Sequence, residues 1–328
     1  MTINAPLRMG TRGSLLALRQ TEQVRGSLIR AHPDLCVEIC IIKTTGDRVQ
    51  NTPLPELGTQ GIFTKEIETA LLNGEIDVAV HSLKDLPTQM PSGLVLHAIC
   101  ERVCPLDVLI TRGRVAMREL QPHSTIGTSS VRRRAQLLRY RSDLTLVDLR
   151  GNLDTRLKKV DAPGPPDGAI LACAGLHRLG LEPRITEVLD SRIMLPAPGQ
   201  GAVAVQGRAE DENTARIFSI LECRETRAAV TAERALMQRL GGGCHVPLGC
   251  LGQVEDGCLT LDAGVFSLDG TAAVRKCLSG DPDEAESIGI RLAEQMLAEG
   301  AREILDACDR TLHPETWQTL PIHTEESS

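Results

Sequence analysis

At 328 residues, with 41% hydrophobic and 24% charged side chains, the chain has the composition of a globular protein of two or three domains. Its formal net charge of -7 and its aromatic content of 2% exclude a general nucleic-acid binder, which needs both cations and stacking platforms. The 11 cysteines include no CxxC pair, and the sequence has no signal-peptide core or run of membrane-spanning length. We therefore expect a cytoplasmic protein with reduced thiols and without membrane, nucleic acid or bound metal.

The N-terminal segment predicts a strand that enters a loop and then a helix. The helix is expected from Leu15 to Ala31, where His32-Pro33 ends it. Ser14 is a candidate N-cap, and free backbone N–H groups beside Arg12 suit a carboxylate or phosphate. A capped helix with a surface arginine explains these residues equally well.

The next units follow the same pattern. A strand is expected around 36–43, an aperiodic loop or flap over 49–61, a helix over 63–72 and a strand over 76–80. In open α/β sheets ligands bind beyond the carboxyl ends of strands, and Lys84 and Asp85 follow the last of these strands. The alternative is a solvated lysine–aspartate pair.

A second run of units begins after a strand over 94–99. A strand is expected over 107–111, and within 124–134 a further strand is expected to end in the three hydroxyl residues Thr128, Ser129 and Ser130 at a helix start. Arg132 and Arg133 lie in the first turn of that helix. Cations there oppose the helix dipole unless an anion lies between them, so anion binding is favoured over a solvated basic face.

Arginines follow two further expected strands. Arg150 and Arg156 come after a strand over 144–148, and Arg178 follows one over 169–173. The ends of successive strands converge on one edge of a parallel sheet. Because arginine binds carboxylates in a bidentate manner, these residues predict a carboxylate-binding edge.

The C-terminal third changes character. The segment 196–201 is a hinge-like linker, and the strand expected over 202–206 is able to return to the first sheet. Asp-Gly turns at 256–257 and 269–270 predict a small antiparallel sheet, closed by a helix over 282–299.

Cys244 follows three consecutive glycines, Gly241 to Gly243, and precedes Pro247. One interpretation is a helix C-cap next to a small buried thiol. The other is a thiol held out toward a ligand by a flexible helix terminus. The anion-binding strand ends supply a site for such a thiol and favour the second interpretation.

Several long motifs, in order, resemble the porphobilinogen deaminase (hydroxymethylbilane synthase) family over residues 7 to 310. They are Thr11-Arg12-Gly13-Ser14, Val80-His81-Ser82-Leu83-Lys84-Asp85-Leu86-Pro87, Gly127-Thr128-Ser129-Ser130-Val131-Arg132-Arg133, Leu149-Arg150-Gly151-Asn152, Pro198-Gly199-Gln200-Gly201, and Glu233-Arg234-Ala235-Leu236 through Gly242-Gly243-Cys244-His245-Val246-Pro247.

The resemblance implies an α/β fold with two doubly wound lobes like those of periplasmic binding proteins, and a small α+β domain with a three-stranded antiparallel sheet. The implied division is 1–102 with 199–219 for a discontinuous first lobe, 103–198 for the second lobe, 220–312 for the cofactor-carrying domain and 313–328 for a disordered tail.

The implied enzyme is a monomer that carries a dipyrromethane on Cys244 through a thioether bond. It deaminates four porphobilinogen molecules, joins them head to tail, and releases hydroxymethylbilane by hydrolysis. The resemblance makes Asp85 the catalytic carboxylate. It assigns cofactor carboxylates to Ser82, Lys84, Thr128, Ser129, Arg132 and Arg133, and substrate or the growing chain to Arg12, Ser14, Arg150, Arg156 and Arg178.

One departure concerns the flap. Relatives often carry lysines before the Gly-(Ile/Leu)-Phe segment, whereas this chain has Glu56 and Gln60 there, with Phe63 kept. A carboxylate-binding role for the flap is therefore open. One rival function is a non-catalytic two-lobed anion binder. The other is a cysteine-nucleophile hydrolase or acyltransferase, which needs a base near the thiol; His245 is adjacent in sequence, but neighbouring residues seldom point at each other. Neither predicts a permanent adduct on the cysteine.

Overall fold

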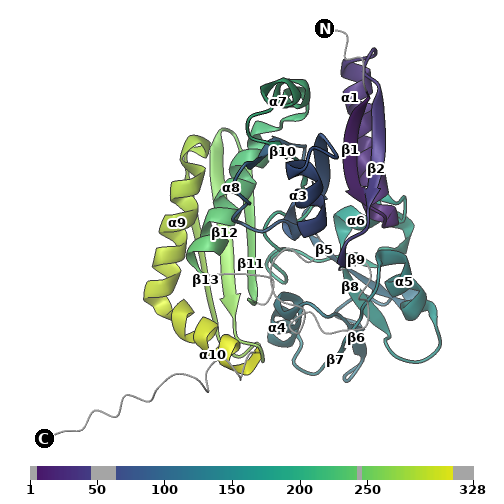
Figure 1. Ribbon diagram of the computed structural model, residues 1–328. Helices are drawn as coiled ribbons and strands as arrows, with labels where there is room; N and C mark the ends of the chain where they lie inside the picture. The colour runs from purple at the N-terminus through teal and green to yellow at the C-terminus, as the bar shows by residue number, and fades with distance from the viewer. Residues whose placement is uncertain (1–5, 46–63, 242–245, 313–328) are drawn as a thin grey trace, which may run out of the picture.

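The computed structural model describes residues 6–45, 64–241 and 246–312 (Figure 1). Cys244 and its neighbour His245, the proposed flap 49–61 with Phe63 beyond it, and the tail 313–328 lie outside these residues. The predictions made for them stay predictions.

The first sheet has five strands in the order β2-β1-β3-β10-β4. Their bounds are β1 Leu7–Arg12, β2 Val37–Ile42, β3 Val78–Ser82, β4 Leu94–Ile99 and β10 Val203–Arg208. The strands β2, β1 and β3 are parallel, whereas β10 runs antiparallel to both of its neighbours. The return of the 202–206 strand to the first sheet is thus confirmed.

Helices cover both faces of this sheet. On one face, α1 (Leu15–Ala31) buries Val24 and Leu28 against strand residues such as Met9. On the other, α3 (Lys65–Leu72) buries Ile67 and Leu71. The short helix α7 (Glu212–Phe218) ends in the fully buried Phe218, which joins the α1 side. A sheet covered on both faces explains why its inner strands β3 and β10 are buried without alternation.

The second sheet repeats this plan in the order β7-β6-β8-β5-β9. Its strands are β5 Asp107–Thr111, β6 Thr125–Gly127, β7 Thr145–Val147, β8 Gly168–Ala172 and β9 Glu187–Val188, and its helices are α4 Val131–Tyr140, α5 Leu153–Asp161 and α6 Cys173–Arg178. The expectation of a parallel sheet needs correction, because β5 runs antiparallel to β8 and β9. The three strands that precede the arginines are parallel.

Two crossing segments connect the sheets and run side by side. The backbone N–H of Val103, in the first crossing, donates to the carbonyl of Gly201 in the second at 3.3 Å. Gly201 has a φ of +89°, and a Cβ atom there would lie 2.2 Å from the Val103 carbonyl oxygen. Only glycine allows the two segments to approach this closely.

A third body lies beside both sheets (Figure 1). Its antiparallel strands are β11 Leu248–Glu255, β12 Cys258–Phe266 and β13 Ala273–Gly280, packed against α8 Arg224–Arg239 and α9 Ala285–Met296. The helix predicted over 282–299 is present as α9 and the short helical segment Leu297–Ala301, but a further helix after it was not predicted. After a turn at Gly300, with φ +96°, the chain continues as α10, Arg302–Leu312.

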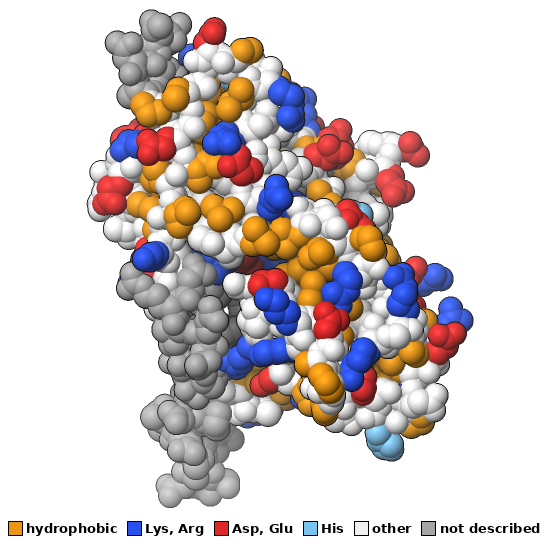
Figure 2. Space-filling model, turned by 90° about the vertical axis from the view of Figure 1, so that its right-hand side faces the viewer, with side chains coloured by type: hydrophobic (Ala, Val, Ile, Leu, Met, Phe, Trp, Pro, Cys, Tyr) orange, Lys and Arg blue, Asp and Glu red, His pale blue; other side chains and the backbone are white. Residues whose placement is uncertain are grey.

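The predicted fold class is confirmed: two α/β sheets covered on both faces, and one small α+β body with three antiparallel strands. Within the described ranges, no helix has both the length and the apolar character needed to cross a membrane. Figure 2 shows a face on which the bodies of the two sheets meet, with basic and acidic side chains interspersed on both.

Candidate active site

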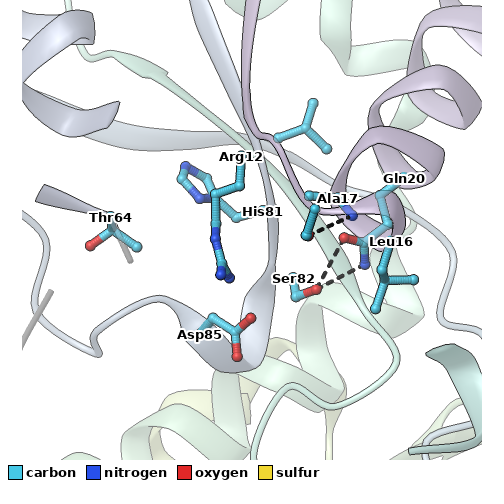
Figure 3. Close-up of a pocket in the computed structure, with 10 residues that line it drawn as sticks. Arg12, Leu16, Ala17, Gln20, Thr64, His81, Ser82 and Asp85 are labelled. Atoms are coloured by element: carbon cyan, nitrogen blue, oxygen red, sulfur yellow. Dashed lines mark hydrogen bonds between the residues drawn. The ribbon is translucent and has the colours of Figure 1, made fainter. Parts of the chain in front are cut away.

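A cavity opens at the carboxyl ends of β1 and β3, in the first sheet (Figure 3). It measures about 60 Å³, which is room for a few water molecules or one carboxylate group rather than a larger ligand. Its lining residues are Arg12, Ser14, Leu16, Ala17, Gln20, Thr64, Val80, His81, Ser82 and Asp85. Four of the predicted site residues therefore share one cavity.

Asp85 and Arg12 approach each other across this cavity. The carboxyl group of Asp85 is exposed at the end of the 3-10 turn η2 (Leu83–Asp85), directly after β3. Arg12 ends β1, and its guanidinium extends toward Asp85 (Figure 3). Because the parallel strands β1 and β3 are neighbours, their ends present a guanidinium and a carboxyl group to the same space.

The turn that carries Asp85 is fixed from two sides. Leu83 is fully buried beneath it. From α8 of the third body, the guanidinium of Arg234 donates to the carbonyls of Pro87 at 2.6 Å and Leu86 at 3.3 Å. The third body thus holds the backbone that presents the candidate catalytic carboxylate. The sequence did not indicate this role for Arg234.

The hydroxyl groups near this cavity are engaged locally. Ser14 caps α1, as predicted, with its Oγ accepting from the backbone N–H of Ala17 at 3.3 Å. The side chains of Ser82 and Gln20 exchange hydrogen bonds at 2.8 and 3.1 Å. Gln20, 3% exposed, was absent from the predicted site residues and fixes the rotamer of Ser82.

His81 lies at the back of the cavity as a neutral imidazole. Burial, together with the nearby charge of Arg12, lowers the pKa of His81 to about 4. Its Nε2 atom has no hydrogen-bond partner among the described residues. At neutral pH this histidine adds no charge to the site.

Lys84 turns toward the second sheet instead. Its ammonium lies 3.5 Å from the side-chain oxygen of Gln200, which belongs to the second crossing segment. Burial lowers the pKa of Lys84 to about 8. Lys84 and Asp85, neighbours in the chain, thus point in different directions: Asp85 lines the cavity of the first sheet, and Lys84 faces Gln200.

Arg132 and Arg133 both bind the buried carboxylate of Asp107. Each guanidinium donates to one oxygen of Asp107 at 2.7 Å, and each also donates to a backbone carbonyl, that of Leu195 or Ile170. Burial favours the neutral acid, but the two arginines outweigh it and hold the pKa of Asp107 well below its usual range. Arg133 Nε keeps no partner among the described residues.

The hydroxyl residues before α4 act as backbone acceptors. Thr128 Oγ1 accepts from the N–H of Ser130 at 3.2 Å, and Ser129 Oγ accepts from that of Leu149 at 3.1 Å. Ser130 caps α4 by accepting from Arg133 N at 3.4 Å. Among the described residues Thr128 and Ser129 only accept, so their hydroxyl protons are left to donate to a ligand.

The remaining predicted arginines divide into two groups. Burial and the repulsion of Arg133 lower the pKa of Arg156 to about 10, while the charge of Asp85 opposes this. Arg156 therefore belongs to the same charged region as Asp85. Arg150 follows β7 and is half-buried.

Arg178 lies elsewhere. It lines a second cavity between α1 and α6, whose other residues are Arg19, Glu22, Gln23, Val103 and His177. Its guanidinium donates to the carbonyl of Gly201 at 2.7 Å, on the crossing segments. The structure does not bring Arg178 into the cavity that Asp85 lines.

No group of three or more His, Cys, Asp or Glu residues in the described part of the chain is arranged to hold a metal ion. The donors present at the site, guanidinium, ammonium and hydroxyl groups, suit an anionic ligand with several carboxylates.

Comparisons with known proteins identify relatives over most of the chain. A family model for the dipyromethane cofactor binding domain of porphobilinogen deaminase matches residues 7–216, and one for the C-terminal domain of that enzyme matches 227–298. The porphobilinogen deaminase of Geobacter metallireducens is 47% identical over 299 residues, which cover 91% of this chain and 93% of the relative. That of Synechococcus elongatus is 45% identical over 313 residues, covering 94% and 98%.

Among solved structures, the periplasmic aliphatic sulphonate binding protein SsuA of Escherichia coli covers 71% of this chain and 70% of its own. It shares 14% sequence identity at a TM-score of 0.36, a similarity too slight to support an inference.

Proposed function

The chain belongs to the porphobilinogen deaminase family, and from this premise we propose how its own residues divide the work of the reaction. The enzyme is a hydroxymethylbilane synthase. It joins four porphobilinogen molecules head to tail with loss of ammonia, on a covalently bound dipyrromethane, and releases hydroxymethylbilane by hydrolysis.

Unused donors support the fit of the described residues to a cofactor rich in carboxylates. Arg133 Nε is buried without a partner among the described residues, and the hydroxyl protons of Thr128 and Ser129 are uncommitted. Together with Lys84 and Ser82, these groups would hold the acetate and propionate side chains of dipyrromethane. When bound, the cofactor supplies the free pyrrole carbon on which the chain grows.

Arg132 contributes through its charge rather than through an unused donor. Its guanidinium donates to Asp107 and to a backbone carbonyl, so its charge acts on a ligand from within the Asp107 cluster. Two arginines against one aspartate leave a net positive charge in a buried place. Such a charge attracts carboxylates over a longer range than an exposed arginine does.

Asp85 carries the catalytic proposal. When the C–N bond of porphobilinogen breaks, its electron pair leaves with ammonia and positive charge develops on the pyrrole nitrogen. The Asp85 carboxylate, exposed to the cavity, stabilises that charge. It would then accept the proton that the nucleophilic pyrrole carbon, which attacks the deaminated substrate, loses once the new C–C bond has formed.

The substrate itself brings two carboxylates to the site. Arg12 beside Asp85, with Ser14 at the start of α1, forms the wall of the cavity that the first sheet supplies. Arg150 and Arg156 come from the second sheet, so substrate would be gripped between the two. The observation that carries the proposal is this meeting of Asp85 and Arg12 at the ends of adjacent strands, with Arg156 in the same field.

Intact mass tests the proposal. The purified protein should exceed the mass of its sequence by two linked pyrrole units, and peptide mapping should place them on Cys244. Cys244→Ser should remove both the added mass and activity, while Cys258→Ser, an exposed cysteine of the same body, should keep both. An active wild-type protein without the adduct would contradict the assignment of Cys244.

We also propose a monomeric enzyme in the cytoplasm, with domain boundaries at 102/103, 198/199 and 219/220. The two crossing segments support the first two boundaries, since the second sheet takes its strands from between them and the first sheet takes its strands from before the first segment and after the second. Light scattering after size exclusion tests the monomer, and limited proteolysis tests the boundaries.

A further inference from the structure

Gln200 occupies a singular place between the two sheets. It lies in the second crossing segment and is 1% exposed. Its side chain reaches Lys84, at the end of β3 in the first sheet, and Asp107, at the start of β5 in the second. It thereby links the turn that carries Asp85 to the carboxylate that holds Arg132 and Arg133.

The orientation of this side chain is fixed by its own hydrogen bonds. Both protons of the amide are used, since Nε2 donates to the carbonyl of Pro105 at 2.7 Å and to Asp107 Oδ1 at 2.9 Å. The oxygen must then face the other way, toward Lys84. The backbone is held as well, because the carbonyl of Gln200 accepts from Arg102 Nε at 2.8 Å.

Lys84 depends on this amide. In the described part of the chain, Gln200 Oε1 is the hydrogen-bond acceptor that its ammonium approaches. The charged groups around Lys84 act in opposite directions: Asp85 and Asp107 favour the ammonium, and Arg132 and Arg133 oppose it. Between these opposing charges, one oriented carbonyl contributes to both the position and the protonation of the amine.

We propose that Gln200 is a positioning residue of the reaction, which holds the ammonium of Lys84 against the Asp107–arginine cluster and so makes its place depend on the distance between the two sheets. The proposal rests on the function given above. At 3.5 Å, the contact with Lys84 is the longest hydrogen bond of the Gln200 side chain. An increase in the distance between the two sheets would therefore release Lys84 first. If the two sheets move apart to accommodate the growing chain, the position of the Lys84 ammonium that faces this chain would change.

The test compares two buried glutamines. Gln136 is 3% exposed and bridges backbone groups of Leu195, without facing Lys84. Gln200→Met and Gln136→Met each remove the amide group and keep a side chain of nearly the same shape. Gln200→Glu keeps a hydrogen-bond acceptor and adds a negative charge. The six lysines of the chain allow the Lys84 ε-carbon to be followed by NMR in holoenzyme, with Lys84→Arg assigning its signal.

The titration midpoint of Lys84 should fall in Gln200→Met, rise in Gln200→Glu and stay unchanged in Gln136→Met. The kcat of Gln200→Met should fall at least about tenfold with cofactor load intact by mass. An unchanged Lys84 titration in both Gln200 variants would overturn the proposal. Because this signal is independent of turnover, that result is distinguishable from failure of the proposed function, which the intact mass of the wild type reports.

Discussion

Arg102 and Glu233 form a bidentate ion pair that joins the first crossing segment to α8, with Nη1–Oε1 and Nη2–Oε2 distances of 2.7 and 3.2 Å. The Glu233 side chain is fully buried. It also accepts from the backbone N–H of Gly199 at 2.6 Å and of Gly252 at 2.7 Å. One carboxylate therefore fastens both crossing segments and the third body at a single point.

Glu233→Gln should destabilise the protein by about 3–5 kcal/mol, because it leaves Arg102 buried without its counter-charge and points an amide N–H at backbone donors. Urea unfolding measures the loss. Glu294→Gln is the control, since its pair with Arg239 is long, at 3.5 Å, and exposed, and such pairs contribute about 0–1 kcal/mol. Equal losses in the two variants would refute the central place of Glu233.

Asp85→Asn should keep the covalent cofactor and lose at least about a hundredfold in kcat, because the amide is nearly isosteric but cannot stabilise developing positive charge. Steady-state kinetics and intact mass measure the two effects. Asp154→Asn, an exposed carboxylate in the first turn of α5, should be neutral in both. Near-normal turnover of the Asp85 variant would remove this residue from the mechanism.

Arg133→Leu should yield protein with a reduced cofactor load, since it removes the unpaired Nε and one of the two cations that offset Asp107. The fraction of loaded protein is read from intact mass. Arg134→Leu changes the next residue, which contacts only the carbonyl of Leu146 in the described part of the chain, and should load fully. A fully loaded Arg133 variant speaks against a cofactor role.

His81 should make the fold sensitive to acid. Its pKa is lowered by burial to about 4 from 6.5, so between these values the unfolded chain binds a proton that the folded protein does not. The contribution of His81 is fully present above pH 6.5 and is lost as the pH falls, by about 2 kcal/mol at pH 5.

Unfolding by urea at pH 7 and pH 5 tests this. His81→Asn should lose less stability between the two pH values than the wild type, whereas His32→Asn, at an exposed histidine, should lose the same amount as the wild type. The idea fails if the two variants respond alike to acid.

Local features of the fold were predictable because short-range chemistry decides them. Ser14 caps α1 because a hydroxyl before a helix satisfies a free N–H, and β4 and β5 have the bounds that were predicted for them. The end of the third body was harder. The helix predicted over 282–299 is followed, after the turn at Gly300, by α10, whose Leu305 packs into the same core.

The site was predictable as a set of anion-binding strand ends, but the pairing within it was not. Asp107 holds Arg132 and Arg133 from a strand about 25 residues earlier in the chain, and nothing local to Asp107 indicates this. Gln200 and Glu233 lie in quoted motifs, where their roles depend on contacts more than 30 residues away. Long-range contacts of single polar groups leave no periodic pattern in a sequence.

The position of β10 has a consequence for synthesis of the chain on the ribosome. This strand lies between β3 and β4, so the first sheet stays split until residue 208 has emerged. The second sheet, whose strands are contiguous in sequence, is complete by residue 188. The part translated first is therefore expected to mature last, with the edges of β3 and β4 exposed to chaperones in the interval.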